Sequence, residues 1–208
     1  MFLIDDQNPS SIAAFGGDTY TPNLDRMAEE GMKFTRAYVS SSVCTPSRYT
    51  FLTGRFAGNS HSKRYVDEVG GKENQGLPNF NVALERDNMN VGKVLREAGY
   101  TTGFVGKYHL TSKLDFPEFY KGKNGWIDIP KDASPSPETS AQFKHNERWM
   151  RRYLRTLGFS WAKNVYPENI HSPYSSHNPE WTTVAALEFI EENKNGPFYL
   201  HLCSTLLH

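Results

Sequence analysis

Hydrophobic and polar residues follow one another along the chain in blocks that predict strands and helices. The apolar run Phe2–Ile4 stops at Asp5 and Asp6, a pattern typical of a buried strand with acids at its C-terminal end. Residues 21–31 predict a helix, because a threonine can cap its start, the following proline fits the first turn and the last glycine fits the position after the helix. Residues 32–39 alternate well enough to predict another strand.

Two later blocks share an order of helix, glycine and strand. Residues 90–98 place apolar side chains at i, i+3, i+4 and i+7 of a helix, Gly99 ends it, and residues 101–105 predict a strand. The same order returns with a helix over 182–192 and a strand over 198–203. Strands that alternate with helices predict an α/β fold with a largely parallel sheet.

The remaining segments predict two more helices and two long loops. A short helix is expected from Pro46 to Gly54, and a longer one over 146–157 has apolar side chains on one side. Residues 56–89 and 111–141 are rich in Gly, Asn, Lys, Pro and Ser and predict long loops, which in an α/β fold gather where ligands bind. A solvated face and an anion-binding face both fit the other side of the longer helix, which carries Arg148, Arg151, Arg152 and Arg155.

Composition and charge exclude some classes of function. Lys plus Arg and Asp plus Glu both number 23 among the 208 residues, so the formal net charge is zero, which argues against a nucleic-acid partner held by broad positive charge. No apolar stretch approaches the roughly 20 residues that span a bilayer. An aromatic content of 13 % supplies large apolar side chains for a core, and the length predicts one domain or part of a larger one.

The two cysteines lie in different contexts and are too few for a disulfide scaffold. Cys203 lies in an apolar block and is expected to be a core thiol. Cys44 comes just before Pro46, which can start a helix, so backbone N–H groups and the helix dipole would favour its thiolate. Arg48 could return toward the same position. From these residues alone, a reactive thiol and a buried structural thiol both stay open for Cys44.

Residues 44–48, Cys-Thr-Pro-Ser-Arg, resemble the Cys-x-Pro-x-Arg signature of the formylglycine-dependent (type I) sulfatases. The resemblance continues into Leu-Thr-Gly-Arg at residues 52–55. Further segments resemble the same family in the right order and extend the match from end to end of the chain: Asp5-Asp6, residues 21–34, residues 106–110 and residues 197–208. The family usually has Trp where this chain has Tyr108.

This resemblance implies an alkaline phosphatase-like α/β sandwich, in which helices flank a central, largely parallel mixed sheet. It also implies that residues 1–208 are the N-terminal portion of a sulfatase catalytic domain, with the later metal ligands and the C-terminal part absent. Analogy with the family favours a periplasmic or secreted location, which the residues themselves leave unknown.

The implied activity is hydrolysis of an organic sulfate ester, such as a sulfated sugar or polysaccharide, to an alcohol and inorganic sulfate. In the family a separate maturation enzyme oxidises the motif cysteine to formylglycine, which makes Cys44 the source of the nucleophile. One hydroxyl of the aldehyde hydrate attacks sulfur and expels the alcohol. The other hydroxyl then loses its proton, sulfate leaves, and the aldehyde returns.

By the same resemblance, Asp5, Asp6 and the converted Cys44 bind Ca²⁺, with Mg²⁺ as an alternative. Adjacent carboxylates at a strand end repel each other unless a cation joins them, and oxygen ligands suit these hard ions. The metal would lower the pKa of the attacking hydroxyl and hold a sulfate oxygen.

Lys107 and His109 lie two residues apart on an extended segment, which points them the same way. The resemblance assigns Lys107 to a sulfate oxygen and to formylglycine, and His109 to the formylglycine hydroxyl and to the base of the release step. Arg48 would orient formylglycine, and His208 would contact sulfate and protonate the leaving oxygen. We expect one pocket at the C-terminal edge of the sheet to contain Asp5, Asp6, Cys44, Arg48, Lys107 and His109.

Two alternatives stay open. One is a phosphate or phosphonate monoester hydrolase of the same fold, because these esters share the tetrahedral geometry of sulfate esters and differ in charge. The other is a non-catalytic, truncated sulfatase-like protein that folds or binds sulfated glycans without turnover. The partners expected are a sulfated small molecule or glycan and the maturation enzyme, with no nucleic acid and no membrane span.

Overall fold

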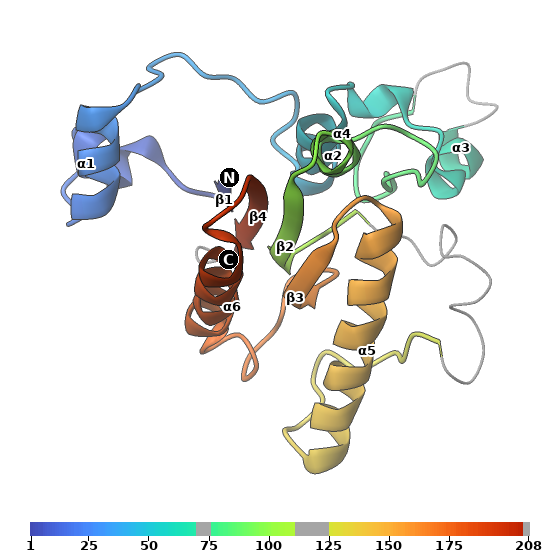
Figure 1. The fold of residues 1–208 in the computed structure, drawn as a ribbon. Coiled ribbons are helices and arrows are strands. Elements are labelled where there is room, and N and C mark those ends of the chain that lie inside the picture. The colour runs from blue at the N-terminus through green and yellow to red at the C-terminus, as the bar shows by residue number, and fades with distance from the viewer. Residues whose placement is uncertain (70–75, 111–124, 206–208) are drawn as a thin grey trace.

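The computed structural model of the chain describes residues 1–69, 76–110 and 125–205. Its centre is a four-stranded sheet with the order β1-β4-β2-β3 (Figure 1). Every neighbouring pair of these strands is parallel, which confirms the predicted parallel sheet; the described strands include no antiparallel one. The strands are β1 (Phe2–Ile4), β2 (Thr101–Lys107), β3 (Trp161–Tyr166) and β4 (Phe198–Ser204).

Six α-helices accompany the sheet in the described part of the chain. They are α1 (Pro22–Glu30), α2 (Cys44–Thr53), α3 (Lys63–Val69), α4 (Val91–Glu97), α5 (Pro137–Thr156) and α6 (Asn178–Asn193). Short 3₁₀ turns occur at Pro9–Ser11, Ala13–Phe15 and Ala57–Asn59. None of the helices described is both long and apolar enough to cross a membrane.

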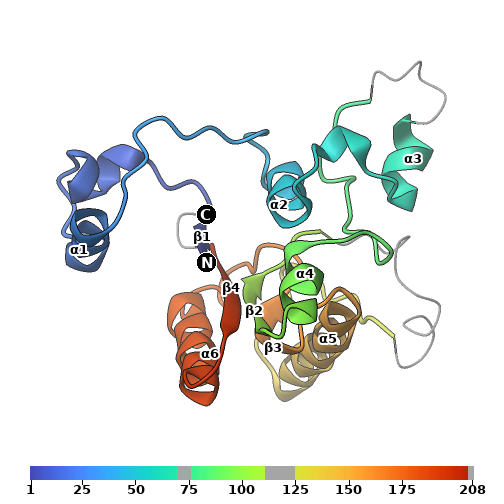
Figure 2. The same ribbon diagram turned by 45° about the horizontal axis from the view of Figure 1, so that its top comes forward.

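Helices cover both faces of the sheet, and a hydrophobic core lies on each (Figure 2). Phe104 and Val105 are neighbours in β2 and point to opposite faces, because side chains alternate along a strand. Phe104 belongs to the larger core, which contains Met150 and Leu154 of α5. Val105 belongs to the smaller core, which contains Phe189 of α6. The molecule is therefore the expected three-layer α/β sandwich.

Several predicted elements are confirmed within a few residues. The strands at 2–4, 101–107 and 198–204 are present. The helix predicted over 90–98 is α4, where the Asn90 side chain caps the start by accepting from the backbone N–H of Lys93 at 3.2 Å. The helix predicted over 182–192 is α6, which begins four residues earlier. The long helix α5 begins nine residues before its predicted start, because Ser136 caps it and Pro137 fits its first position.

Other expectations were wrong. Residues 32–39 form no strand, and all of them are exposed, because no neighbouring strand pairs with them in the described structure. Thr21 does not cap α1, since its hydroxyl donates to Asp25 instead. Gly31 ends α1 with φ −123°, outside the left-handed region that favours glycine. The segments expected as loops contain α3 and the first five residues of α5, and no sequence pattern predicted β3.

Candidate active site

The C-terminal edge of the sheet collects the predicted site residues. Asp5 directly follows β1, and Lys107 is the last residue of β2. Because β1, β4 and β2 are parallel neighbours, both residues lie at the same edge. Helix α2 brings its first residue, Cys44, and Arg48 toward this edge, since residues four apart share a helix face.

Asp5, Arg48 and Lys107 form a buried ion cluster. Arg48 Nη2 donates to Asp5 Oδ1 at 2.7 Å, and Lys107 Nζ donates to Asp5 Oδ2 at 2.7 Å. The exposed fractions of the side chains are 9 % for Asp5, 3 % for Arg48 and 0 % for Lys107. Burial by itself raises the pKa of Asp5, but the charges and hydrogen bonds of the two cations outweigh it and hold the pKa below its ordinary value.

Cys44 and His109 form a second contact. Cys44 Sγ lies 3.1 Å from His109 Nδ1. Helix α2 begins at Cys44 itself, two residues before the predicted start, with Pro46 in its first turn. The thiol therefore lies at a helix N-terminus and within hydrogen-bond distance of an imidazole, the arrangement of a nucleophile beside a base.

Hydrogen bonds to two backbone oxygens hold Arg48 and His109 in place. Arg48 Nη1 donates to the backbone oxygen of Lys107 at 2.8 Å, which links α2 to the end of β2. The backbone N–H of His109 donates to the oxygen of Pro167 at 2.8 Å, so the segment after β3 holds His109 in place. His109 has φ 54°, a left-handed conformation that non-glycine residues adopt rarely and that often marks a functional site.

Gly106 permits the close approach of β2 and β4 beneath the site. Its φ is 90°, and a Cβ atom at this position would lie 1.9 Å from the backbone oxygen of Cys203. Cys203 is fully buried, as predicted for a core thiol, and burial raises its pKa to about 11. A glycine before Lys107 is thus required by sterics.

Two predicted residues lie apart from these contacts or outside the description. Asp6 follows Asp5 with φ 56° and is exposed, so its side chain does not share the burial of the Asp5 cluster. His208 lies outside the described residues.

The predicted metal set does not fit the described residues as they stand. Within residues 1–69, 76–110 and 125–205, no group of three or more His, Cys, Asp and Glu side chains could surround a metal ion. Both carboxylate oxygens of Asp5 accept hydrogen bonds from cations instead. The oxygen chemistry of Asp5 and Asp6 suits Ca²⁺, but two carboxylates are too few for an ion that takes about 6–8 oxygen ligands.

Phe80 lies beside His109 in the candidate site, although no sequence motif pointed to it. Its ring centroid lies 5.4 Å from that of His109, and 52 % of the residue is exposed. Arg64 holds the backbone of this residue by donating to its oxygen at 3.1 Å. The only sequence signal was its place in the 56–89 segment, where a ligand-binding loop was expected.

Comparison with known proteins gives one family over the whole chain. The family model described as Sulfatase matches residues 1–208. An arylsulfatase of Hemicentrotus pulcherrimus is 27 % identical over 217 residues, covering 100 % of this chain and 36 % of the relative. The N-acetylgalactosamine-6-sulfatase of Rattus norvegicus is 34 % identical over 140 residues, covering 62 % of this chain and 25 % of the relative. The chain thus spans little more than a third of the first relative's length.

Solved structures share the fold. One, a protein in complex with its substrate D-glucosamine-2-N,6-O-disulfate, has a TM-score of 0.55 and 20 % identity, covering 100 % of this chain and 34 % of its own. A sulfatase of Pseudoalteromonas sp. has a TM-score of 0.56 and 20 % identity, covering 100 % and 43 %. The phosphonate monoester hydrolase of Agrobacterium radiobacter has a TM-score of 0.52 and 18 % identity, covering 98 % and 40 %. These likenesses confirm the fold that the sequence resemblance implied.

Proposed function

The chain belongs to the sulfatase family. From this premise we propose that it carries the nucleophile, and the residues that position it, of a site that hydrolyses organic sulfate esters. The observation that carries the proposal is the contact of Cys44 Sγ with His109 Nδ1 at 3.1 Å, at the start of α2 and beside the Arg48–Asp5–Lys107 cluster. A nucleophile, a base and buried cations at one sheet edge are the groups that transfer of a sulfuryl group requires.

We propose that a separate maturation enzyme converts Cys44 to formylglycine. When present, the aldehyde supplies a hydrated nucleophile from which sulfate can be released without a second attack on sulfur. The surroundings fit this group, since Cys44 is only partly buried and its side chain reaches a titratable imidazole. His109 is the proposed proton acceptor for the release of sulfate, and Arg48 is the proposed positioning residue for the first turn of α2.

The charge of the described cluster favours a sulfate ester. Arg48 and Lys107 carry two positive charges and Asp5 one negative, which leaves an excess of one positive charge. A sulfate monoester carries a single negative charge, whereas a phosphate monoester carries about −1.5 to −2 near pH 7. By charge, sulfate ester hydrolysis therefore ranks ahead of phosphate monoester hydrolysis. The fold shared with the phosphonate monoester hydrolase keeps phosphate or phosphonate esters as the second candidate.

The substrate we propose is a sulfated sugar or glycan. N-acetylgalactosamine-6-sulfatase is named among the relatives, and a structural neighbour holds a sulfated glucosamine. Ca²⁺ at Asp5 and Asp6 and a role for His208 stay predictions from the family resemblance. A non-catalytic protein is the remaining alternative, which the experiment below tests.

The test uses full-length protein made with and without a formylglycine-generating enzyme. Mass spectrometry of the peptide with Cys44 measures the conversion, and hydrolysis of 4-nitrophenyl sulfate and 4-nitrophenyl phosphate measures activity. We expect sulfate hydrolysis only in the converted protein and little with phosphate. Equal sulfate hydrolysis without conversion would refute the nucleophile, a preference for phosphate would support the second candidate, and converted but inactive protein would support the non-catalytic alternative.

A further inference from the structure

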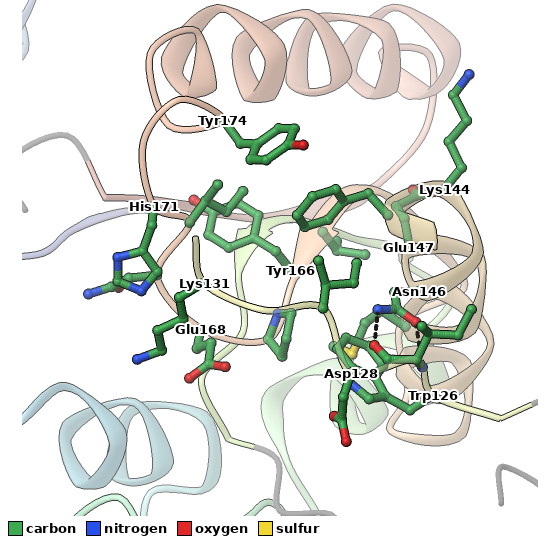
Figure 3. Close-up of a pocket in the computed structure, with 18 of the residues that line it drawn as sticks. Trp126, Asp128, Lys131, Lys144, Asn146, Glu147, Tyr166, Glu168, His171 and Tyr174 are labelled. Carbon is green, nitrogen blue, oxygen red and sulfur yellow. Dashed lines mark hydrogen bonds between the residues drawn. The ribbon is translucent and has the colours of Figure 1, made fainter. Parts of the chain in front are cut away.

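A cavity of about 420 Å³ lies between α5 and the segment that follows β3 (Figure 3). Its walls come from α5, the end of β3, and the segments 126–131 and 167–174. Cys44, Arg48, Lys107 and His109 do not line it, so it is a separate space.

One wall of the cavity is fixed in place by paired contacts. Asn146 of α5 accepts from the backbone N–H of Ile127 at 3.0 Å and donates to the oxygen of the same residue at 2.7 Å. His145 Nε2 contacts the backbone oxygen of Gly125 at 2.7 Å. Trp126 packs edge-on against the buried ring of Trp149, with centroids 5.5 Å apart. These contacts hold the 126–131 segment against α5, so this wall of the cavity has a defined structure.

The lining combines aromatic rings with polar groups that hydrogen bond. The rings come from Trp126, Phe143, Tyr166, Tyr174 and Trp181. Glu147 of α5 also lines the cavity, and its carboxylate accepts from the backbone N–H of Asn164 at 3.2 Å. Burial raises the pKa of Glu147.

Two residues of this lining carry a buried polar atom that is not hydrogen-bonded in the described structure. Among the described residues, Tyr174 Oη and Asn169 Oδ1 have no hydrogen-bond partner. Buried polar groups are normally paired, because an unpaired one costs free energy. The Tyr174 ring packs on Phe143 at 4.7 Å, and Figure 3 shows it extending from the 167–174 segment over the cavity.

This chemistry suits an uncharged sugar ring better than an anion. Aromatic rings offer flat apolar faces on which the C–H groups of a sugar can pack, and carboxylates and amides accept from its hydroxyls. The carboxylates of Asp128, Glu147 and Glu168 in the lining would repel a sulfate group. Lys131, Lys144 and His171 also belong to the lining, but the amino group of Lys144 extends away from the cavity (Figure 3).

The cavity and the candidate active site are adjacent. Tyr166 lines the cavity and is the register partner of Lys107 on the neighbouring strand. Paired strands lie about 4.8 Å apart. The backbone N–H of Tyr108 donates to the oxygen of Tyr166 at 2.9 Å. The wall of the cavity and the candidate active site are therefore carried by neighbouring strands.

We propose that this cavity is a carbohydrate subsite, which binds an unsulfated sugar ring next to the sugar whose sulfate ester is cleaved at Cys44. The proposal rests on the proposed function for its link to catalysis, but the binding of the sugar itself does not require the chemistry of Cys44.

The test measures binding to the full-length Cys44→Ala protein, which cannot form formylglycine. The neutral disaccharides N,N′-diacetylchitobiose, lactose and neoagarobiose are titrated in turn, with calorimetry and tryptophan fluorescence as readouts. We expect at least one to bind, and Tyr174→Phe or Glu147→Gln to weaken its binding about tenfold through the loss of a hydrogen bond. Glu191→Gln, a carboxylate-to-amide change at an exposed position of α6, is the control and should leave binding unchanged.

The thermal stability of the Tyr174→Phe variant shows whether this hydroxyl binds a ligand or supports the fold. Tyr174→Phe removes a hydroxyl that has no partner among the described residues, so the thermal midpoint should stay the same or rise while binding falls. The proposal is overturned if none of the three sugars binds, or if both cavity variants bind as well as the parent. Turnover of 4-nitrophenyl sulfate by the wild type tests the proposed function independently of this result.

Discussion

At the scale of single residues, the site depends on one carboxylate that pairs with two buried cations. Arg48 and Lys107 are removed from water, which costs free energy unless an anion and hydrogen bonds replace their hydration. Asp5 supplies one oxygen to each of them at 2.7 Å. The three side chains come from β1, α2 and β2, so this cluster also ties the three elements together.

We expect Asp5→Asn to lower the free energy of unfolding by about 3–5 kcal/mol, because it leaves buried charge uncompensated. Lys107→Met keeps the Asp5–Arg48 pair and removes one charge, so it should cost less. Urea unfolding of both variants near neutral pH makes the comparison. If Lys107→Met is the more destabilising of the two, Asp5 is not the shared counter-ion.

Cys44→Ala should abolish sulfate ester hydrolysis and change stability little. The substitution removes the proposed nucleophile, but Cys44 is only partly buried and alanine fits the first turn of α2. Turnover of 4-nitrophenyl sulfate and the thermal midpoint check the two halves of this prediction. Activity close to that of the wild type would contradict the role of Cys44. A large drop in the midpoint would show that the thiol is mainly structural.

At the scale of elements, sequence periodicity predicted the helices and strands whose pattern of apolar residues is local in the sequence. The helices α4 and α6 carried an apolar face with a glycine after it, and the strands β2 and β4 were apolar runs. Strand β3 was missed because it contains Lys163 and Asn164, which no pattern marks as strand residues. The structure explains why these two polar residues fit in the strand. Lys163 pairs with Glu188 of α6, and Asn164 has φ 53° at a register shift between β2 and β3. Such pairings depend on residues far away in the sequence.

Gly106→Ala should destabilise the protein by at least about 2 kcal/mol, because alanine is strained at positive φ and its Cβ would meet a backbone oxygen that cannot move aside. Gly196→Ala is the matched control, since no atom lies within 4 Å of the Cβ it would add. Chemical denaturation compares the two. Equal stability of the two variants would show that β2 and β4 can separate at this point without cost.

His201, inside β4, should make stability fall in acid. Burial, with the positive charges of Arg48 and the chain's amino group, lowers its pKa to about 3, whereas an unfolded histidine titrates near 6.5. Between these values the unfolded state binds more protons, so the free energy of unfolding falls with falling pH, by up to about 1.4 kcal/mol per pH unit. Urea unfolding at pH 7, 5 and 4 should show a smaller loss for His201→Leu than for the wild type. The same loss in both would exclude His201, and the exposed His61→Leu serves as control.

At the scale of the whole molecule, the site comes from segments that are distant in the sequence. The family motifs pointed to Asp5, Cys44, Arg48, Lys107 and His109, and parallel strands explain why those segments meet at one edge. The individual contacts could not be predicted, because they depend on the strand order β1-β4-β2-β3 and on the position of α2. The contact of Phe80 with His109 and the cavity beside β3 could not be predicted for the same reason. In addition, a loop residue gives no periodic signal in the sequence.

This arrangement leads to an expectation about calcium. The chain of residues 1–208 by itself should bind Ca²⁺ weakly, because Asp5 is already engaged by Arg48 and Lys107 and the described residues form no group of three His, Cys, Asp or Glu side chains that could hold a metal ion. Ca²⁺ takes about 6–8 oxygens, and it would have to displace two charged hydrogen bonds to reach this carboxylate. Calorimetric titration of the chain, with Asp6→Asn as the comparison, measures the affinity. Micromolar binding that Asp6→Asn abolishes would show that Asp6 belongs to a complete calcium site, with its other ligands outside the residues described.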